Sequence, residues 1–333
     1  MRIVVIGATG HVGGYLIPRL VLAGHEVIAI SRGQQPPYRD HPSWSAVQRV
    51  VADRQAEDAT GVFAGRVADL HPDVVIDMIC FTRESAEQLV GALTGRVELL
   101  IHCGSIWVHG PSAEVPTVED SPRHPFGEYG IGKAEIEDVL VHASRRGGLP
   151  SIVLHPGHIS GPGWPVINPA GNTNPNVWHR LATGQEVLLP NLGLETLHHV
   201  HADDVAQAFE LAARRPAQAI GQSFHITSER AITLQGYAKA VAGWFGQQAN
   251  LRYVPFPEFR AATTAEHADL TWGHIARSAS MSVDKARQLL GYRPRYTSLQ
   301  AVAEALHWLQ RNHQVDVGHD DFAYLPEQSN SEA

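Results

Sequence analysis

A tyrosine and a lysine stand four residues apart in the segment Tyr129-Gly-Ile-Gly-Lys133. That spacing puts a phenol and an ammonium on one face of a helix. Because a nearby cation favours the phenolate, we expect Lys133 to lower the pKa of Tyr129 from its free value of about 10. A tyrosine tuned in this way can transfer protons. The alternative is an exposed i, i+4 pair on an amphipathic helix, which is common in proteins.

Glycines at positions 7, 10 and 13 follow an apolar, β-branched run at the start of the chain. Such a strand, turn and helix lets backbone N–H groups approach a pyrophosphate, and the helix N-terminus favours its negative charge. The two motifs together predict a cofactor site and a proton-transfer site on one chain.

These motifs resemble those of the short-chain dehydrogenase/reductase superfamily, in its extended branch of NAD-dependent epimerases and dehydratases. The three glycines match that branch's Gly-x-x-Gly-x-x-Gly pattern, and Ser105-Ile-Trp-Val-His-Gly110 matches its Ser-x-x-Val-Tyr-Gly pattern. The resemblance implies that Ser105, Tyr129 and Lys133 are catalytic: the tyrosine as acid or base, the serine as hydrogen-bond partner of the same substrate oxygen, and the lysine also as a ligand of the nicotinamide ribose. Residues 174–193 and 282–294 look closest to the chloroplast stem-loop-binding group.

The end of the second expected strand bears on cofactor choice. NAD-preferring folds place a carboxylate there, whereas this chain has Ser31-Arg32-Gly33. A guanidinium suits a 2′-phosphate, so the sequence favours NADP(H) over NAD(H). In the alternative, Arg32 is a solvated loop residue and NAD is bound through backbone contacts.

The resemblance implies further cofactor contacts. Asp53 matches a carboxylate that binds the adenine amino group, or is simply a turn residue, and residues 78–80 match the segment beside the nicotinamide ribose, or belong to the core. The expected cofactor-binding residues are Gly7, Thr9, Gly10, His11, Val12, Gly13, Ser31, Arg32, Asp53, Arg54, Met78, Ile79, Cys80, Lys133, Pro156, His158 and Ile159.

Departures from the family pattern concern the substrate. Glu195 stands where nucleotide-sugar epimerases carry an arginine that grips a diphosphate, and a second arginine is missing near Thr271–His274. We therefore expect a polyol or sugar-like substrate with less anionic character, or other anion ligands. The candidate substrate residues are His109, Trp107, His158, Trp164, Arg180, Arg252 and Arg277.

Twenty histidines invite a metal hypothesis. Zinc sites usually have regular ligand spacing, which the cluster of His198, His199 and His201 lacks. We therefore expect no metal. His109 and His158 are better candidates for substrate contact or acid–base assistance, or they are polar residues that line a cleft.

The order of apolar patterns predicts an α/β fold. Expected strands at 3–6, 26–30, 47–51, 74–79, 97–102, 152–154 and 223–226 alternate with helices at 12–23, 55–70, 83–94, 129–146 and 203–215, as in a Rossmann, doubly wound parallel sheet of about seven strands. We assign residues 1–155 and 200–227 to this NAD(P)-binding domain. Residues 156–199 and 228–310 form a smaller, discontinuous α/β substrate lobe, and residues 313–333 a mobile tail.

The amino-acid composition disfavours some classes of binding partner. The 333 residues include 26 basic and 34 acidic side chains, a net charge of −8, which is no footprint for nucleic acid or an acidic membrane. The chain has two cysteines, no apolar stretch long enough to span a bilayer, and an expected strand directly after Met1. These features predict a cytoplasmic protein. We expect a homodimer that acts on a small molecule.

Three function classes stay open. The first is an epimerase or dehydratase that oxidises a secondary alcohol of a sugar or sugar-like substrate. The second is an NADPH-dependent ketone reductase or alcohol dehydrogenase on a non-nucleotide substrate. The third is a non-catalytic, RNA-associated protein, which the complete set of Ser105, Tyr129 and Lys133 disfavours.

Overall fold

The computed structural model describes residues 1–214 and 216–318, and it divides the chain into two compact units. The first unit comprises Met1–Ile159, Val200–Glu229 and Met281–Arg295. The second comprises Ser160–His199, Arg230–Ser280 and the chain from Tyr296 onward. Segment 281–295, which we assigned to the substrate lobe, therefore belongs to the first unit. There the Tyr292 hydroxyl donates a hydrogen bond of 2.9 Å to the carbonyl of Thr227 in the same unit.

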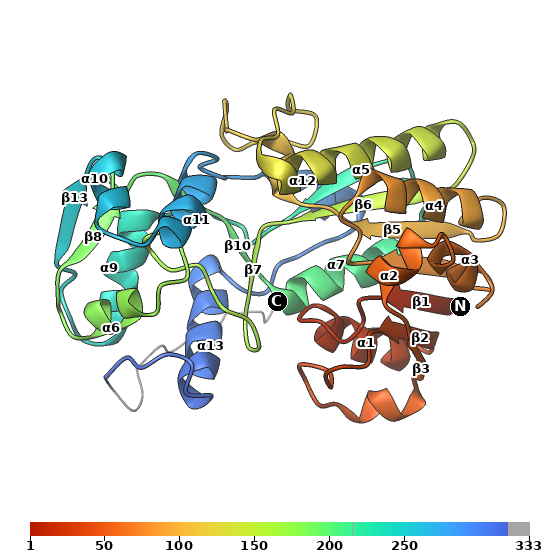
Figure 1. The fold of residues 1–333 in the computed structure, drawn as a ribbon, viewed down its shortest axis with the longest axis horizontal. Coiled ribbons are helices and arrows are strands. Elements are labelled where there is room, and N and C mark those ends of the chain that lie inside the picture. Colours follow the sequence, from red (N-terminus) through yellow and green to blue (C-terminus); the bar gives the residue numbers. More distant parts are fainter. Residues whose placement is uncertain (215, 319–333) are drawn as a thin grey trace. The chain divides into compact units, whose positions relative to one another are not determined.

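A seven-stranded parallel sheet in the order β11-β6-β5-β4-β1-β2-β3 forms the centre of the first unit (Figure 1). This confirms the expected Rossmann-like, doubly wound α/β class. The strands are β1 (Arg2–Ile6), β2 (Glu26–Ser31), β3 (Gln48–Val51), β4 (Val74–Asp77), β5 (Leu99–Cys103), β6 (Ser151–Pro156) and β11 (Ser223–Ile226). The strand order reverses between β1 and β4, the position where such sheets bind ligands at their carboxyl ends.

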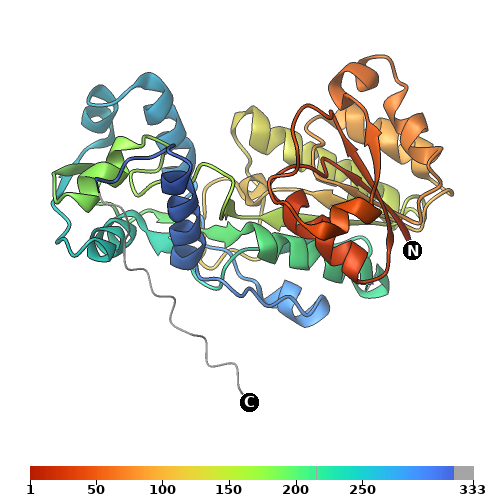
Figure 2. The ribbon, with the colours of Figure 1, turned by 90° about the horizontal axis from the view of Figure 1, so that it is seen from below.

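Helices cover both faces of this sheet, as the alternation of side chains along β1 requires. Ile3 and Val5 pack in one apolar cluster with α1 and α7, whereas Val4 and Ile6 pack in another with α4 and α5. Figure 2 shows α1 and α7 side by side. The helical elements of the unit are α1 (Gly13–Leu22), η1 (Pro42–Ala46), α2 (Arg54–Ala59), α3 (Phe63–Ala68), α4 (Arg83–Leu93), η2 (Ile106–His109), α5 (Gly127–Arg145), α7 (Ala202–Arg214), α8 (Pro216–Ala219) and α12 (Asp284–Leu289).

The prediction of one continuous helix over residues 55–70 is wrong. Residues 55–70 form two helices, α2 and α3, rather than one. Gly61 lies between them with a φ of 72°, a left-handed conformation that ends α2 because a helix cannot continue through it.

The second unit packs its helices around Trp178 and Tyr237, both fully buried, and the Tyr237 hydroxyl donates to the carbonyl of Ile167 at 2.9 Å. Its elements are α6 (Asn176–Ala182), β8 (Val187–Pro190), β9 (Thr196–Leu197), β12 (Ile232–Thr233), α9 (Leu234–Trp244), β13 (Leu251–Val254), α10 (Phe256–Ala261), α11 (Ala265–Ile275) and α13 (Ser298–Arg311). The short strands β7 (His158–Ser160) and β10 (His199–His201) lie where the chain passes from one unit to the other. Most of the expected mobile tail lies outside the described residues. Within the described chain, no helix combines the length and apolarity that crossing a membrane requires.

Candidate active site

The glycine turn after β1 borders a cavity of about 750 Å³ in the first unit. Gly7 has a φ of 85°, and a β-carbon on it would lie 2.8 Å from Cγ2 of Ile79, so the turn needs glycine there. α1 begins after the turn without a side-chain cap at Val12 and without an acidic residue in its first turn. Such a helix N-terminus offers backbone N–H groups and partial positive charge to an anion. The turn and cavity therefore fit the diphosphate of a dinucleotide.

The structure brings about half of the expected cofactor residues to this cavity. Those that line it are Gly7, Thr9, Gly10, Ser31, Arg32, Asp53, Arg54 and Ile79. Among the residues that the structure describes, the following expected cofactor residues do not line the cavity: His11, Val12, Gly13, Met78, Cys80, Lys133, Pro156, His158 and Ile159. Gly13 instead allows close packing, because a β-carbon there would come within 2.0 Å of the Ala8 carbonyl oxygen.

Arg32 and Asp53 reach the cavity as exposed side chains. Asp53 also caps α2, since its Oδ1 accepts a hydrogen bond of 3.2 Å from the backbone N–H of Ala56. The two readings of Asp53, turn residue and cofactor ligand, are therefore compatible.

Arg54 lines the cavity, but its guanidinium is committed to the protein. Nη1 lies 2.5 Å from Oδ1 of Asp77, and Nε lies 3.2 Å from Oδ2 of Asp58 and 3.0 Å from Oγ of Ser85. A buried guanidinium with these partners fixes the wall of the cavity, and its Nη2 has no hydrogen-bond partner among the described residues.

Ser105, Tyr129 and Lys133 come together in the first unit, on α5 and at the start of η2. Ser105 caps η2 by accepting a hydrogen bond of 3.2 Å from the N–H of Trp107, and its hydroxyl lies near enough to Tyr129 to act on the pKa of that residue. Lys133 is 2% exposed, and its Nζ donates to the carbonyls of Cys80 at 2.8 Å and Cys103 at 2.7 Å.

Phe81 connects these residues with the cavity that it also lines. Its ring centroid lies 4.8 Å from Nζ of Lys133 and 6.5 Å from the Tyr129 ring. A ligand that extends along the cavity past Phe81 therefore approaches both the phenol and the ammonium.

The pKa of Tyr129 differs from the expectation. Although 46% of the residue is exposed, partial burial raises its pKa to about 12; negative charge on the Cys103 sulfur adds to this rise and the Ser105 hydroxyl opposes it. Lys133 is not among the causes of this shift, and its Nζ is held by the carbonyls of Cys80 and Cys103. Without a cofactor, the phenol is thus a protonated group, and the expected lowering of its pKa by Lys133 is wrong.

The substrate candidates of the first unit have different environments. Trp107 meets the Tyr129 ring edge-on, with centroids 5.7 Å apart, and His158 is half-buried in β7. His109 is 2% exposed and hydrogen-bonded to His225, so it is an interior residue rather than a residue of an open cleft.

In the second unit, Arg180 and Arg252 line one cavity of about 500 Å³. Both contact Glu186: Arg180 donates to its carbonyl at 2.9 Å, and Nε of Arg252 lies 3.1 Å from its carboxylate. Arg277 is 3% exposed and donates to the carbonyl of Gly273, whereas Trp164 is 45% exposed.

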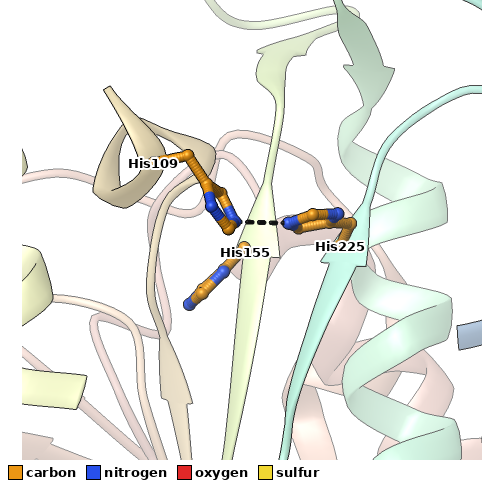
Figure 3. A group of neighbouring side chains, drawn as sticks. All are labelled: His109, His155 and His225. Atoms are coloured by element: carbon orange, nitrogen blue, oxygen red, sulfur yellow. Dashed lines mark hydrogen bonds between the residues drawn. The ribbon is translucent and has the colours of Figure 1, made fainter. Parts of the chain in front are cut away.

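Three buried histidines that sequence reasoning did not connect converge in the first unit (Figure 3). His109 ends η2, and His155 and His225 pair directly across β6 and β11. Nε2 of His109 lies 2.8 Å from Nε2 of His225, and burial lowers the pKa of His109 to about 4. The signal in the sequence was that each strand histidine is the second-last residue of its strand, but adjacency of those strands had to be known first.

Two buried carboxylates flank these histidines. Oε2 of Glu137 lies 3.1 Å from Nε2 of His155, and Oε1 of Glu119 accepts a hydrogen bond of 2.9 Å from the backbone N–H of His225. Burial raises the pKa of Glu119. Burial alone would also raise the pKa of Glu137, but His155, Ser223 and Arg123 outweigh it and hold that pKa below its usual range.

Comparisons with known proteins identify relatives of this chain. The chain is similar to the chloroplast stem-loop binding protein of 41 kDa b of Arabidopsis thaliana, at 27% identity over 91% of this chain and 78% of the relative. It is also similar to 2'-dehydrokanamycin reductase of Streptomyces kanamyceticus, at 27% identity over 77% of this chain and 70% of the relative. Among solved structures, UDP-glucose 4-epimerase of Thermotoga maritima with UDP-glucose shares the fold, with a TM-score of 0.70, 20% identity, and coverage of 94% of this chain and 100% of the other.

A match to a family model shows the family to which the chain belongs. The model of the NAD dependent epimerase/dehydratase family matches residues 3–227, which include the glycine turn, Ser105, Tyr129 and Lys133. The chain therefore belongs to the NAD-dependent epimerase/dehydratase family of extended short-chain dehydrogenases/reductases, a family of NAD(P)-dependent enzymes.

Proposed function

We propose that this enzyme oxidises a secondary alcohol of a sugar or sugar-like substrate, as an epimerase or dehydratase does, with Tyr129 as the acid/base. The observation that carries the proposal is the group of Ser105, Tyr129 and Lys133 beside a cavity that begins at the glycine turn. The nicotinamide supplies the hydride acceptor and donor when it is bound. The expected homodimer stays a prediction.

In the proposed reaction, side chains of the protein transfer the proton. The Tyr129 hydroxyl gives its proton to a substrate carbonyl oxygen as the carbonyl is reduced, and it regains a proton as an alcohol is oxidised. The Ser105 hydroxyl, which acts on the pKa of the same phenol, orients that substrate oxygen. Because burial raises the pKa of Tyr129 to about 12, the phenol is ready to donate at neutral pH, whereas the oxidative direction first requires that it lose its proton.

The nucleotide that leaves the denatured protein tests this class. An epimerase or dehydratase returns the hydride to its substrate, so a tightly held cofactor released in a one-to-one ratio supports it. Cofactor that is lost on gel filtration supports a net oxidoreductase instead. A protein that binds neither NAD(H) nor NADP(H) contradicts both and leaves a non-catalytic role.

The second candidate is a reductase that acts on a non-nucleotide substrate. Glu195, in the second unit, supports it, because the carboxylate repels a diphosphate; its Oε1 accepts a hydrogen bond of 2.5 Å from the side chain of Asn191. The similarity to 2'-dehydrokanamycin reductase, whose name describes a net reduction, points the same way. Tight binding of UDP-glucose, measured by calorimetry, would contradict this candidate and would indicate an enzyme that acts on nucleotide sugars.

We further propose that the cofactor is NADP(H). Arg32 is exposed on the cavity wall, and a guanidinium there attracts a 2′-phosphate. Arg32→Asp should lower the affinity for NADPH at least tenfold more than the affinity for NADH, because a like charge then faces the phosphate. Fluorescence titration of both nucleotides measures this. Arg96→Asp, a half-exposed arginine paired with Asp69, is the control. Equal losses for the two nucleotides would show that Arg32 does not recognise the phosphate.

A further inference from the structure

We propose that His109, His155 and His225 form a binding site for one divalent transition-metal ion, with Zn²⁺ as the reference ion. This inference departs from our expectation that the chain binds no metal. It does not depend on the proposed reaction, because the site is built within the first unit from side chains other than Ser105, Tyr129 and Lys133.

The three rings lie close together (Figure 3). One ring nitrogen of each histidine lies within 4.8 Å of those of the other two, and the side chains come from η2, β6 and β11. Zn–N bonds of about 2.0–2.1 Å in a tetrahedral arrangement place ligand nitrogens roughly 3.3 Å apart. Because His109 and His225 already stand 2.8 Å apart, ring movements on the order of 1 Å are sufficient to surround an ion.

The outer partners of two rings are those of metal-ligating histidines, whose second nitrogen is held by a carboxylate or a backbone carbonyl. Nδ1 of His225 lies 3.3 Å from the carbonyl of Ser282, so its Nε2 faces the cluster. Nε2 of His155 faces Glu137 at 3.1 Å. Neither ring nitrogen of His155 makes a hydrogen bond among the described residues, so Nδ1 is available to an ion while Nε2 faces the Glu137 carboxylate.

Burial and charge also favour a cation. The three histidines are 2%, 1% and 0% exposed, and buried ring nitrogens without partners are costly in an interior. An ion supplies Nδ1 of His155 with a partner and replaces the single proton shared between His109 and His225. The buried carboxylates of Glu119 and Glu137 offset its charge, although Arg123 shares Glu137 at 2.9 Å.

A cavity lies beside the two carboxylates that flank the histidines. Glu119 and Glu137 both line a cavity of about 840 Å³ in the first unit. A hydrated ion can therefore reach the two carboxylates that flank His225 and His155 before it exchanges water for imidazole. Three imidazoles select ions of the Zn²⁺, Cu²⁺ and Ni²⁺ class over Mg²⁺ and Ca²⁺, which prefer oxygen ligands.

Such an ion would hold η2 against β6 and β11. Because Ser105 caps η2 and His109 ends it, the metal acts as a positioning group for the serine turn rather than as a reactant. Its loss should therefore loosen that turn and lower thermal stability.

The experiment uses the full chain, purified without a polyhistidine tag, stripped with a chelator and titrated with Co²⁺ and then Zn²⁺. We expect one equivalent of Co²⁺ with the visible absorption of a four-coordinate site, its displacement by Zn²⁺, and a higher Tm with the metal bound. His225→Asn and His109→Gln should each weaken binding at least a hundredfold. Glu137→Gln, which removes an outer partner, should weaken it about 10- to 100-fold.

His102→Asn is the matched control, because His102 is a buried histidine of the neighbouring strand β5 that lies outside the cluster. It should bind Co²⁺ as the wild type does. Wild-type protein that shows only the weak spectrum of six-coordinate surface Co²⁺ would overturn the proposal, and this measurement needs no variant to fold. Binding that is equal in wild type and a folded His225→Asn variant would overturn it as well.

Discussion

At the scale of single residues, the Tyr129 hydroxyl is the group on which the proposed chemistry depends. Tyr129→Phe keeps the ring that meets Trp107 and Phe81 but removes the transferable proton. We expect hydride transfer to fall by at least about two orders of magnitude, the range of positioned proton transfer, while the Kd for NADPH stays within about twofold. Single-turnover absorbance of the nicotinamide with carbonyl substrates measures the first, and fluorescence titration the second.

Tyr253→Phe provides the control for that comparison. Tyr253 is 39% exposed in the second unit, and its hydroxyl makes one hydrogen bond of 3.4 Å to Gln235. Its loss should leave hydride transfer unchanged. Turnover of Tyr129→Phe near the wild-type rate would mean that another group moves the proton.

Sequence reasoning found the residues of local motifs and missed those that only the fold brings together. Spacing alone placed Tyr129 and Lys133 on one helix. It could not show that burial raises the pKa of Tyr129 or that two backbone carbonyls hold the lysine, so the predicted direction of the pKa shift was wrong. The pairing of His155 with His225 could not be predicted for a related reason, since parallel strands that pair are far apart along the chain.

At the scale of elements, the close approach of α1 to the turn after β1 is the constraint on the glycine motif. A β-carbon on Gly13 would lie 2.0 Å from the Ala8 carbonyl oxygen, a backbone atom that cannot rotate away. We expect Gly13→Ala to lower the free energy of unfolding by on the order of 2–3 kcal/mol, as overpacking does, and to weaken NADPH binding at least tenfold. Urea unfolding and fluorescence titration measure the two effects.

Gly65→Ala is the matched control, since Gly65 lies within α3 and a β-carbon there meets no atom within 4 Å. It should stabilise the protein by about 0.5–1 kcal/mol through helix propensity and leave cofactor binding unchanged. If Gly13→Ala behaved like Gly65→Ala, close helix packing would not be the reason for that glycine.

The elements also show where apolar periodicity is a weak guide. The alternation of strands and helices predicted the seven strands of the sheet, because buried parallel strands are continuous β-branched runs. It did not reveal the break between α2 and α3, because the pattern of apolar residues continues across Gly61 while the backbone does not.

At the scale of the whole molecule, the unit to which a segment belongs depends on its tertiary contacts, and the spacing of apolar residues in the sequence does not reveal those contacts. Segment 281–295 follows the second unit's helix α11 in sequence, yet it belongs to the first unit. Tyr292 is fully buried there and hydrogen-bonded to Thr227, whereas nothing in its sequence neighbourhood indicates that partner.

Stability of the whole molecule should depend on pH through buried histidines. Burial lowers the pKa of His274 to about 4, while its Nδ1 donates to the carbonyls of Gly171 and Leu270. Between pH 6.5 and 4 the unfolded chain binds a proton that the folded chain does not, so stability is full above pH 6.5 and falls as the pH drops. His274 should account for a loss on the order of 3 kcal/mol at pH 4.

Urea unfolding of wild type and His274→Asn at pH 7 and pH 4 checks this, with the variant expected to lose less stability on acidification by that amount. His71→Asn is the control: His71 is exposed with a φ of 50°, a conformation that asparagine tolerates. Identical acid sensitivity in His274→Asn and wild type would mean that His274 does not stay neutral in the folded state.

The two carbonyls that hold Lys133 limit what a ligand can obtain from it. An ammonium has three N–H donors, and those of Lys133 are already shared with Cys80 and Cys103. One donor is left, so an incoming molecule receives a single hydrogen bond unless it displaces a carbonyl.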